Sequence, residues 1–308
     1  MADKQIKTVS IIGLGALGIL FGYQLAKKLP KENLRVIADP ERIKKYQEQK
    51  LYCNGEICDF YYLSPQTQCE PADLILFTVK YQDLQEAIQA VRNQVGEHTI
   101  ILSALNGITS EEIIGAEYGM GKMLYCVAQG MDAVKEGNQL TYAHMGMLVV
   151  GELGRSEASD KLKSVIEFFE QTEIPYQVDM DMRKRLWGKF MLNVGVNQTV
   201  AVIEGSYGDI QQEGPAREKM INAMREVIKL SELEGIFLTE EDLIYWLKIL
   251  STLSPEGKPS MRQDLEARRY SEVELFAGTV LKLAKKYGMK TPVNQTLYDT
   301  IRKIESNY

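Results

Sequence analysis

The segment LWGKFMLNVGVNQ, residues 186–198, combines apolar residues typical of a buried helix with three polar residues at helical spacing. Lys189, Asn193 and Asn197 recur every four residues, so on a helix they form one polar stripe. Because burying an ammonium group and two amides without partners is costly, the stripe is predicted to face a polar partner, water or a ligand. A lysine in such a stripe could protonate a substrate, although it could also be a surface lysine paired with a neighbouring acid.

A second candidate site is the glycine-rich loop near the N-terminus. It consists of Gly13, Leu14, Gly15, Ala16, Leu17 and Gly18. The loop follows an apolar run typical of a strand and opens a helical pattern. Glycines there allow a tight turn, close approach of a pyrophosphate and close helix–sheet packing. A purely structural turn is the alternative, but the strand–loop–helix context favours dinucleotide binding.

The residues after the next predicted strand bear on the choice of dinucleotide. Asp39 ends that strand, and a carboxylate there typically accepts hydrogen bonds from ribose hydroxyls and repels a 2′-phosphate, which favours NAD(H). Arg42, Lys44 and Lys45 follow within six residues and could bind a phosphate instead. Asp39 could also simply begin the following helix as an Asx-type turn.

Apolar periodicity indicates which elements position these residues. The patterns over residues 8–15, 34–39, 72–79, 98–105, 122–130, 140–146 and 147–153 predict strands, and helical patterns lie between several of them. After about residue 180 nearly all segments show helical periodicity. We therefore predict an α/β fold, with a Rossmann-type dinucleotide-binding domain over residues 1–180 and an all-helical substrate and catalytic domain over residues 181–308.

Composition excludes several classes of protein. The 308 residues are 45% hydrophobic and 25% charged, and the net charge of −6 argues against a nucleic-acid partner. No apolar run reaches the roughly 18 residues of a membrane span, so no membrane partner is expected. The first predicted strand begins within ten residues of Met1 and leaves no room for a signal peptide, which predicts a cytoplasmic protein.

The cysteines and histidines do not form a recognisable metal site. They are Cys53, Cys58, Cys69, Cys126, His98 and His144. No CxxC pair occurs, so we expect structural thiols and no metal. His98 precedes a predicted strand, at the edge of the sheet away from a cofactor, and His144 falls within a strand pattern. Neither histidine is well placed to donate a proton, and the lysines are better candidates.

Taken together, the motifs resemble the ketopantoate reductase family from end to end. The matching segments are the glycine loop, FTVK ending at Lys80, LNG containing Asn106 and Gly107, W-x-K-x-x-x-N-x-x-x-N from Trp187 to Asn197, and SMRQDLEARRYSEVE from Ser260 to Glu274. The resemblance implies reduction of 2-dehydropantoate to (R)-pantoate with NADPH, in pantothenate and coenzyme A biosynthesis.

The resemblance also implies roles for individual residues. Lys189 would be the general acid and Glu272 its partner in the site. Asn193 and Asn197 would hold hydroxyl and carbonyl groups of the substrate, and Ser260 would hold its carboxylate.

Two further residues, Lys80 and Asn106, would lie at strand ends beside the cofactor and the substrate. Each also has a bland explanation: Asn106-Gly107 is a plain turn signal, and Lys80 could simply begin a loop. The family commonly has arginine near the end of the second strand, where this sequence has Asp39. Similar proteins that prefer NADH reduce other branched or aromatic 2-keto acids to D-2-hydroxy acids, and a non-catalytic dinucleotide-binding sensor is a remote alternative.

The assignments of Ser260 and Glu272 conflict if one straight helix carries both. They would lie roughly 18 Å apart along its axis, so either the helix breaks around Arg269-Tyr270 or one of them acts indirectly. Ser260 also fits a capping box with Gln263 at the third helical position. The long helices from residue 215 onward could form a homodimer interface, or only the core of their own domain.

Overall fold

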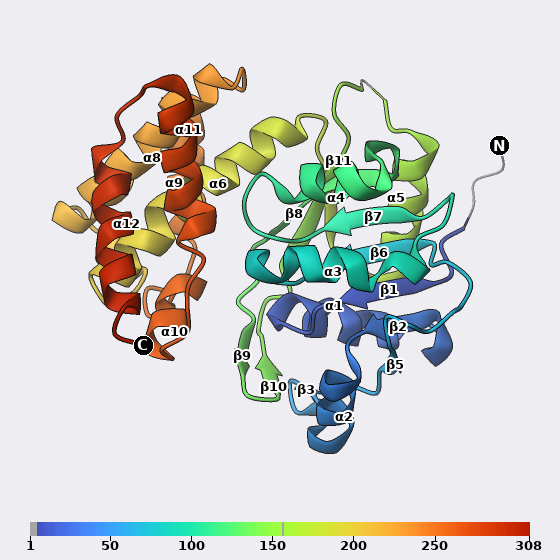
Figure 1. Ribbon diagram of the computed structural model, residues 1–308. Helices are drawn as coiled ribbons and strands as arrows, with labels where there is room; N and C mark the ends of the chain where they lie inside the picture. Colours follow the sequence, from blue (N-terminus) through green and yellow to red (C-terminus); the bar gives the residue numbers. More distant parts are fainter. Residues whose placement is uncertain (1–4, 156) are drawn as a thin grey trace. The chain divides into compact units, whose positions relative to one another are not determined.

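The computed structural model of the protein describes residues 5–155 and 157–308 (Figure 1). The chain divides into two compact units. The first runs up to Leu105 and continues from Thr109 to Met182, and the second comprises Asn106–Ile108 and Arg183–Tyr308. The predicted α/β fold followed by helices is confirmed.

The main sheet belongs to the first unit. In the described part of the chain its order is β12-β11-β8-β7-β6-β1-β2-β5. The strands are β1 (Val9–Ile12), β2 (Leu34–Ile37), β5 (Tyr61–Leu63), β6 (Leu74–Phe77), β7 (Ile100–Ser103), β8 (Met123–Gln129), β11 (Met147–Gly151) and β12 (Tyr176–Val178). The six neighbouring strands β8-β7-β6-β1-β2-β5 are parallel to one another, whereas β11 is antiparallel to β8. Strand order reverses between β1 and β6, which is where ligands bind in sheets of this kind.

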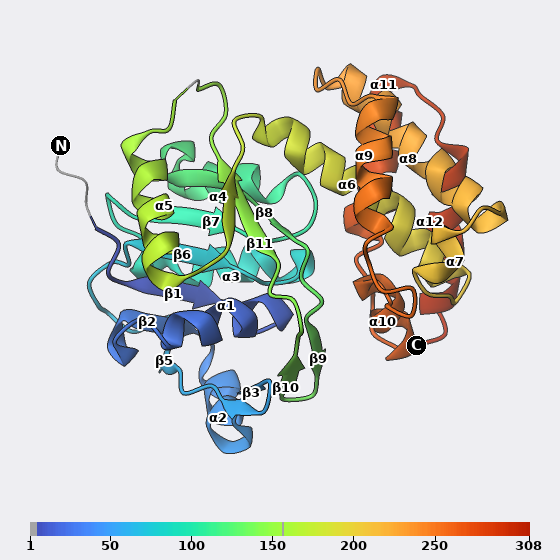
Figure 2. The same ribbon diagram turned by 180° about the vertical axis from the view of Figure 1, so that it is seen from behind.

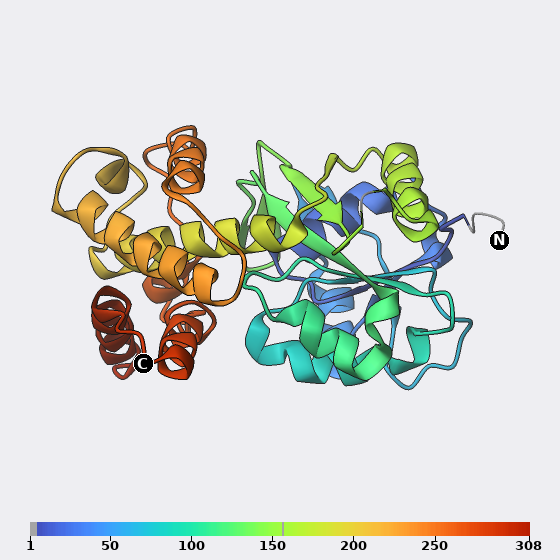
Figure 3. The same cartoon turned by 90° about the horizontal axis from the view of Figure 1, so that it is seen from above.

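Helices cover both faces of this sheet. They are α1 (Ala16–Ala26), α2 (Pro40–Gln49), α3 (Leu84–Ala90), α4 (Ser110–Tyr118) and α5 (Asp160–Thr172), with short 3₁₀ turns η1 (Lys31–Asn33), η2 (Tyr81–Asp83), η3 (Arg92–Gln94) and η4 (Met120–Lys122). Figure 3 shows α1 and α5 on one side of the sheet and α3 and α4 on the other. Each face has its own apolar core, one containing Phe21 and Phe169 and the other containing Ile88 and Ile114. The central strands are buried on both faces, which explains their continuous apolar sequences.

A smaller sheet with the order β4-β3-β10-β9 lies beside α2 (Figures 1 and 2). Its strands are β3 (Tyr52–Cys53), β4 (Glu56–Ile57), β9 (Val134–Glu136) and β10 (Gln139–Thr141). The strand predicted over residues 140–146 is therefore wrong beyond Thr141. Asp132 Oδ1 accepts hydrogen bonds from the backbone N–H groups of Ala143 and His144, which hold an exposed loop instead of a strand.

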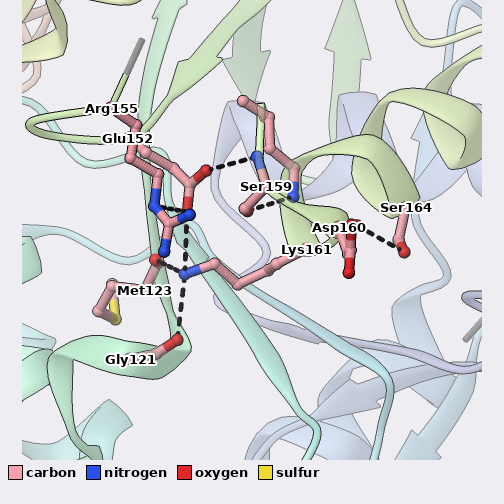
Figure 4. A network of polar contacts seen from close by, with 9 residues as sticks. Gly121, Met123, Glu152, Arg155, Ser159, Asp160, Lys161 and Ser164 are labelled. Atoms are coloured by element: carbon pink, nitrogen blue, oxygen red, sulfur yellow. Dashed lines mark hydrogen bonds and ion pairs between the residues drawn. The ribbon is translucent and has the colours of Figure 1, made fainter. Parts of the chain in front are cut away.

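A half-buried lysine, Lys161, joins three elements at one end of the main sheet (Figure 4). Lys161 Nζ donates to the carbonyl oxygens of Gly121 (3.0 Å) and Met123 (2.5 Å) and lies 3.7 Å from Glu152 Oε1. Burial lowers the pKa of Lys161, while Glu152 opposes that shift. Glu152 also accepts a hydrogen bond from the backbone of Ser159, the residue that caps α5. The network fixes the start of α5 against β8 and β11.

The second unit is helical, as predicted. Its elements are α6 (Met182–Val202), α7 (Gly208–Gln211), α8 (Pro215–Leu233), α9 (Glu240–Leu250), α10 (Ser260–Glu266), the π-helix η5 (Glu274–Gly278), α11 (Thr279–Tyr287) and α12 (Pro292–Glu305). α8 packs against α11 and α12, and its apolar face, including Met220 and Val227, is buried. No helix in the described part of the chain is long and apolar enough to cross a membrane.

The helical pattern that follows Ser260 does not form one straight helix. α10 ends at Glu266, and Arg268 adopts a left-handed conformation with φ of 52°. The chain then turns, and Ser271 donates from its backbone N–H and its hydroxyl to Glu305 Oε1 (2.8 and 2.6 Å). This anchor sets where Glu272 and the π-helix begin. Of the two alternatives left by the sequence, the helix break is the one observed.

Candidate functional site

The glycine loop between β1 and α1 is held by a side chain from the neighbouring strand β6. Thr78 Oγ1 donates to the carbonyl oxygen of Gly13 (2.6 Å) and lies 3.1 Å from that of Ile12. α1 begins at Ala16 without a side-chain cap, so its first N–H groups remain directed at the loop. Sequence reasoning missed Thr78, although its place in FTVK directly after a strand was a usable signal.

The three glycines of the loop differ in whether the fold requires them. A Cβ at Gly13, whose φ is +98°, would meet Val79 Cγ1 at 2.7 Å, and one at Gly18 would collide with the Gly13 carbonyl oxygen. The fold itself therefore excludes side chains at these two positions. Gly15 differs, because its φ of −73° suits any residue and a Cβ would find its nearest neighbour 3.7 Å away. Packing therefore does not explain Gly15, and close approach of a pyrophosphate is a constraint that would require glycine there.

A groove runs from this loop to the end of β2. Gly13, Leu14, Val79, Asp39 and Arg42 contribute to its lining. Its position at the switch point of the sheet is the one expected for the adenosine half of a dinucleotide. Lys80 directly follows Val79 at the carboxyl end of β6, where its carbonyl oxygen accepts a hydrogen bond from Asp83 N.

Asp39 and Arg42, which gave opposite indications of the cofactor in the sequence analysis, interact directly. Asp39 is the N-cap of α2, and its Oδ1 accepts a hydrogen bond from the backbone N–H of Arg42 (2.9 Å). Its Oδ2 lies 3.2 Å from Arg42 Nε. The Asx-type helix start, which the sequence analysis gave as an alternative role for Asp39, is thus observed. This ion pair partly neutralises both charges, so this end of the groove is neither simply acidic nor simply basic.

In the second unit, the polar stripe of residues 186–198 lies on α6 as predicted. Lys189 and Asn193 are half-buried, and Asn197 is 6% exposed. The neighbouring Trp187 is buried and packs edge-on against Phe190, so its role is in packing.

Five side chains of this unit form one continuous series of hydrogen bonds, here named the amide series. Ser260 Oγ donates to Asn197 Oδ1 (3.2 Å), Asn197 Nδ2 to Asn193 Oδ1 (3.4 Å), Asn193 Nδ2 to Asn106 Oδ1 (3.5 Å), and Asn106 Nδ2 to Glu272 Oε2 (3.2 Å). All four distances lie at or beyond the long end of the usual range for such bonds. Each bond is therefore weak and can be exchanged for one to a ligand.

The capping box expected at Ser260 is wrong. α10 has Pro259 as its N-cap without a side-chain hydrogen bond, and Gln263 Nε2 donates to the Lys258 carbonyl oxygen instead. The hydroxyl of Ser260 and the backbone N–H of Met261 both point to Asn197 Oδ1. The first turn of α10 thus directs its donors to the amide series.

Asn106 belongs to the second unit together with Gly107 and Ile108, although Leu105 and Thr109 on either side of this segment belong to the first. It precedes Gly107, whose φ of +95° confirms the turn signal. A Cβ at Gly107 would meet Leu275 Cδ1 at 2.6 Å, so the turn packs tightly against the π-helix. Sequence reasoning missed this role of Leu275, and only the three-dimensional contact reveals it.

Two of the four cysteines, Cys53 and Cys58, are buried thiols. Burial raises the pKa of Cys53 to about 11 and that of Cys58 to about 12, which keeps both as unreactive thiols near neutral pH. Among the described residues, no group of three or more histidine, cysteine, aspartate or glutamate side chains is arranged to hold a metal ion.

Comparison with known proteins identifies the family. Residues 9–155 match the family described as "Ketopantoate reductase PanE/ApbA", and residues 181–305 match its C-terminal counterpart, "Ketopantoate reductase PanE/ApbA C terminal". The chain belongs to the ketopantoate reductase family and is an oxidoreductase of that family.

Individual relatives agree with this assignment. The 2-dehydropantoate 2-reductase of Aquifex aeolicus is 27% identical over 239 residues, which cover 76% of each chain. A PanE/ApbA family ketopantoate reductase from Ralstonia eutropha has a similar structure, with a TM-score of 0.83 at 23% identity over 97% of this chain and 99% of its own. D-mandelate dehydrogenase in complex with NADH gives a TM-score of 0.86 at 21% identity, with the same coverage. The two structural likenesses describe the fold.

Proposed function

We propose that the protein reduces 2-dehydropantoate to (R)-pantoate with a reduced nicotinamide dinucleotide. The observation that carries this proposal is the amide series beside Lys189. The stripe brings two amides to one face of α6 and connects them to Ser260, Asn106 and Glu272. Such a surface offers several donors and acceptors to a small, highly oxygenated substrate. The relatives are named 2-dehydropantoate 2-reductases, and we take 2-dehydropantoate as the substrate from those names.

Lys189 has the most demanding role in the proposed reaction. When bound, the cofactor would supply the hydride for the ketone carbon. The ammonium of Lys189 would give its proton to the oxygen that becomes the hydroxyl group, and its charge would stabilise that oxygen as negative charge develops. Asn193 and Asn197 would orient the keto acid, Ser260 would bind its carboxylate, and Glu272 would hold Asn106 in place.

The first unit is proposed to bind the cofactor. Gly15 supports this role most directly, because neither its backbone conformation nor its packing requires glycine. Gly15→Ala is expected to raise the KM for the cofactor about tenfold or more while changing the free energy of unfolding by less than about 1 kcal/mol. Kinetics and urea unfolding of the same variant test this. Unchanged cofactor affinity would show that the loop serves the fold alone.

A second candidate function is reduction of another branched or aromatic 2-keto acid with NADH. The observation that favours it is Asp39 at the end of β2, whose second oxygen remains able to accept hydrogen bonds from ribose hydroxyls. We infer from Asp39 a preference for NAD(H), tempered by Arg42 at its side.

The decisive experiment measures kcat/KM for 2-dehydropantoate with NADPH and with NADH, beside a set of 2-keto acids that lack the 4-hydroxyl group. A site that hydrogen-bonds this hydroxyl should discriminate against the analogues by a large factor. Turnover of 2-dehydropantoate with either cofactor at such a ratio supports the proposal. Equal or better turnover of the apolar analogues would replace it with the second candidate.

A further inference from the structure

The loop that carries Asn106 connects β7 to α4, and three buried residues hold its two ends together. Ser103 is the last residue of β7, and Ser110 is the first residue of α4. Their hydroxyl oxygens lie 2.8 Å apart, and Ser110 Oγ donates a hydrogen bond to Glu111 Oε2 (3.0 Å). Each of the three residues is at most 2% exposed. We name Ser103, Ser110 and Glu111 the loop clamp.

The hydrogen bonds of the loop clamp run in one direction. A serine hydroxyl has one proton to donate. Because Ser110 gives its proton to Glu111, the proton between the two serines must come from Ser103. Ser103 Oγ in turn accepts a hydrogen bond from the backbone N–H of Leu105 (3.4 Å). The carboxyl of Glu111 is therefore the acceptor at which the series ends, and it orients both hydroxyl groups.

The loop clamp encloses the segment in which the chain leaves the first unit. The chain enters the second unit at Asn106 and returns to the first at Thr109. Thr109 is the N-cap of α4, but within the described structure its side chain does not cap the helix. The clamp therefore takes the place of a cap in fixing where α4 begins. With both of its ends fixed, the short loop between them can adopt few conformations.

A carboxyl group is a costly choice for this position. Burial raises the pKa of Glu111 to about 7, although the Ser110 hydroxyl and nearby backbone N–H groups favour the charged form. Among the described residues, Oε1 of the same carboxyl is buried without a hydrogen-bond partner. An apolar side chain of similar volume would avoid both costs. Stability therefore does not explain Glu111, and placement of the loop is a role that would require an acceptor there.

We propose that the loop clamp positions the amide of Asn106 within the amide series. Asn106 Nδ2 donates to Glu272 Oε2 at 3.2 Å, and its Oδ1 accepts from Asn193 Nδ2 at 3.5 Å. Bonds of these lengths restrain the amide only weakly, so its place depends on the backbone of the loop. The inference rests on the proposed function, in which the amide series holds the keto acid. The residues of the clamp act through Asn106 and are positioning residues.

The experiment measures steady-state kinetics with the 2-keto acid that the wild type reduces best. Ser103→Ala removes the link between the loop ends, and Glu111→Leu removes the final acceptor at similar volume. Each is expected to raise KM for the keto acid about fivefold, because the amide is no longer held in place. Glu111→Gln retains an acceptor oxygen and should keep KM within about twofold of the wild type. The double variant should raise KM no further than either single change, since both break one series.

A matched control separates positioning from stability. Ser10 is as buried as Ser103, and its hydroxyl donates to Gln94 Oε1 (2.9 Å) beneath another strand, β1. Ser10→Ala should lower the free energy of unfolding, measured in urea, and leave KM unchanged. A purely structural clamp would give the same result in Ser103→Ala and Glu111→Leu, with kcat falling only as the folded fraction falls.

Several outcomes would overturn the inference. They are an unchanged KM in Ser103→Ala and Glu111→Leu, an equal rise of KM in Ser10→Ala, and a KM in Glu111→Gln as high as in Glu111→Leu. A wild type that reduces no 2-keto acid would overturn the proposed function and this inference with it. A wild type that reduces another keto acid but not 2-dehydropantoate would overturn the proposed substrate alone, because the variants are compared on the acid that is reduced.

Discussion

Two polar networks share helix α6 in the second unit, and they differ in how tightly they are bonded. One is the amide series, which includes Asn193 and Asn197. The other, here named the core network, begins one residue later at Gln198, whose Nε2 donates to Asn294 Oδ1 (3.1 Å). Asn294 Nδ2 in turn donates to Glu226 Oε2 (2.7 Å). The core network joins α6, α12 and α8.

The core network shows what a structural polar cluster looks like in this protein. Gln198 and Asn294 are fully buried, and Glu226 accepts two backbone N–H groups at the start of α12, from Val293 (2.9 Å) and Asn294 (3.0 Å). The bonds of the amide series are longer, from 3.2 to 3.5 Å. Two of its members, Asn193 and Ser260, are not fully buried, and neither is Lys189, one helical turn before Asn193. Short, buried bonds maintain the fold, whereas long bonds between partly exposed groups leave capacity for a substrate.

The largest expected effect concerns Lys189. Lys189→Ala should lower kcat by about a thousandfold, because the proton donor and its positive charge are lost together, while the free energy of unfolding changes by less than about 1 kcal/mol. Steady-state kinetics and urea unfolding measure the two quantities. Lys184→Ala, which removes a lysine paired with Asp242 at 3.0 Å on the same helix, is the control and should retain kcat. Similar kcat values in the two variants would contradict the proposed role.

The core network should respond in the opposite way. Glu226→Ala leaves three donors of Val293 and Asn294 without this acceptor, two of them buried, and should lower the free energy of unfolding by about 3 kcal/mol. The folded fraction should keep kcat/KM within about a factor of two. Glu226→Gln retains acceptor oxygen and should lose less stability. A large loss of kcat/KM at unchanged stability would place Glu226 in the site and remove the distinction between the networks.

The smallest effect is expected at the end of the amide series. Ser260→Ala removes one hydroxyl, so KM for the keto acid should rise about fivefold, which corresponds to roughly 1 kcal/mol. Ser251→Ala is a suitable control, because Ser251 Oγ also makes a single hydrogen bond, to the Lys248 carbonyl oxygen at the end of α9. Equal KM values for both variants would show that the series ends at Asn197.

Local patterns allowed the sequence to predict much of this arrangement. The polar stripe and the glycine loop each depend on residues within one or two turns of chain, so spacing alone identifies them. The same holds for the central strands, which are buried on both faces and therefore continuously apolar. The residues of the amide series were all named, but not their mutual bonds.

Contacts between distant residues explain what the sequence did not predict. The break after α10 depends on the bond between Ser271 and Glu305, which are 34 residues apart. Helical periodicity continues across the break, so no local signal marks it. The loop at His144 likewise has the apolar content of a strand, yet Asp132, twelve residues earlier, bonds its backbone into a turn.

The membership of Asn106 in the second unit has a consequence for the order in which the protein is built. Its bonding partners Asn193 and Glu272 follow it by 87 and 166 residues. The glycine loop and its supporting strands leave the ribosome first because synthesis starts at the N-terminus. The domain that contains them can therefore begin to fold before the helical unit is made. Asn106 can meet Asn193 once the first part of the helical unit has emerged, but its bond to Glu272 must await most of the remaining chain. A chain that stops before residue 272 would contain the glycine loop but could never complete the amide series.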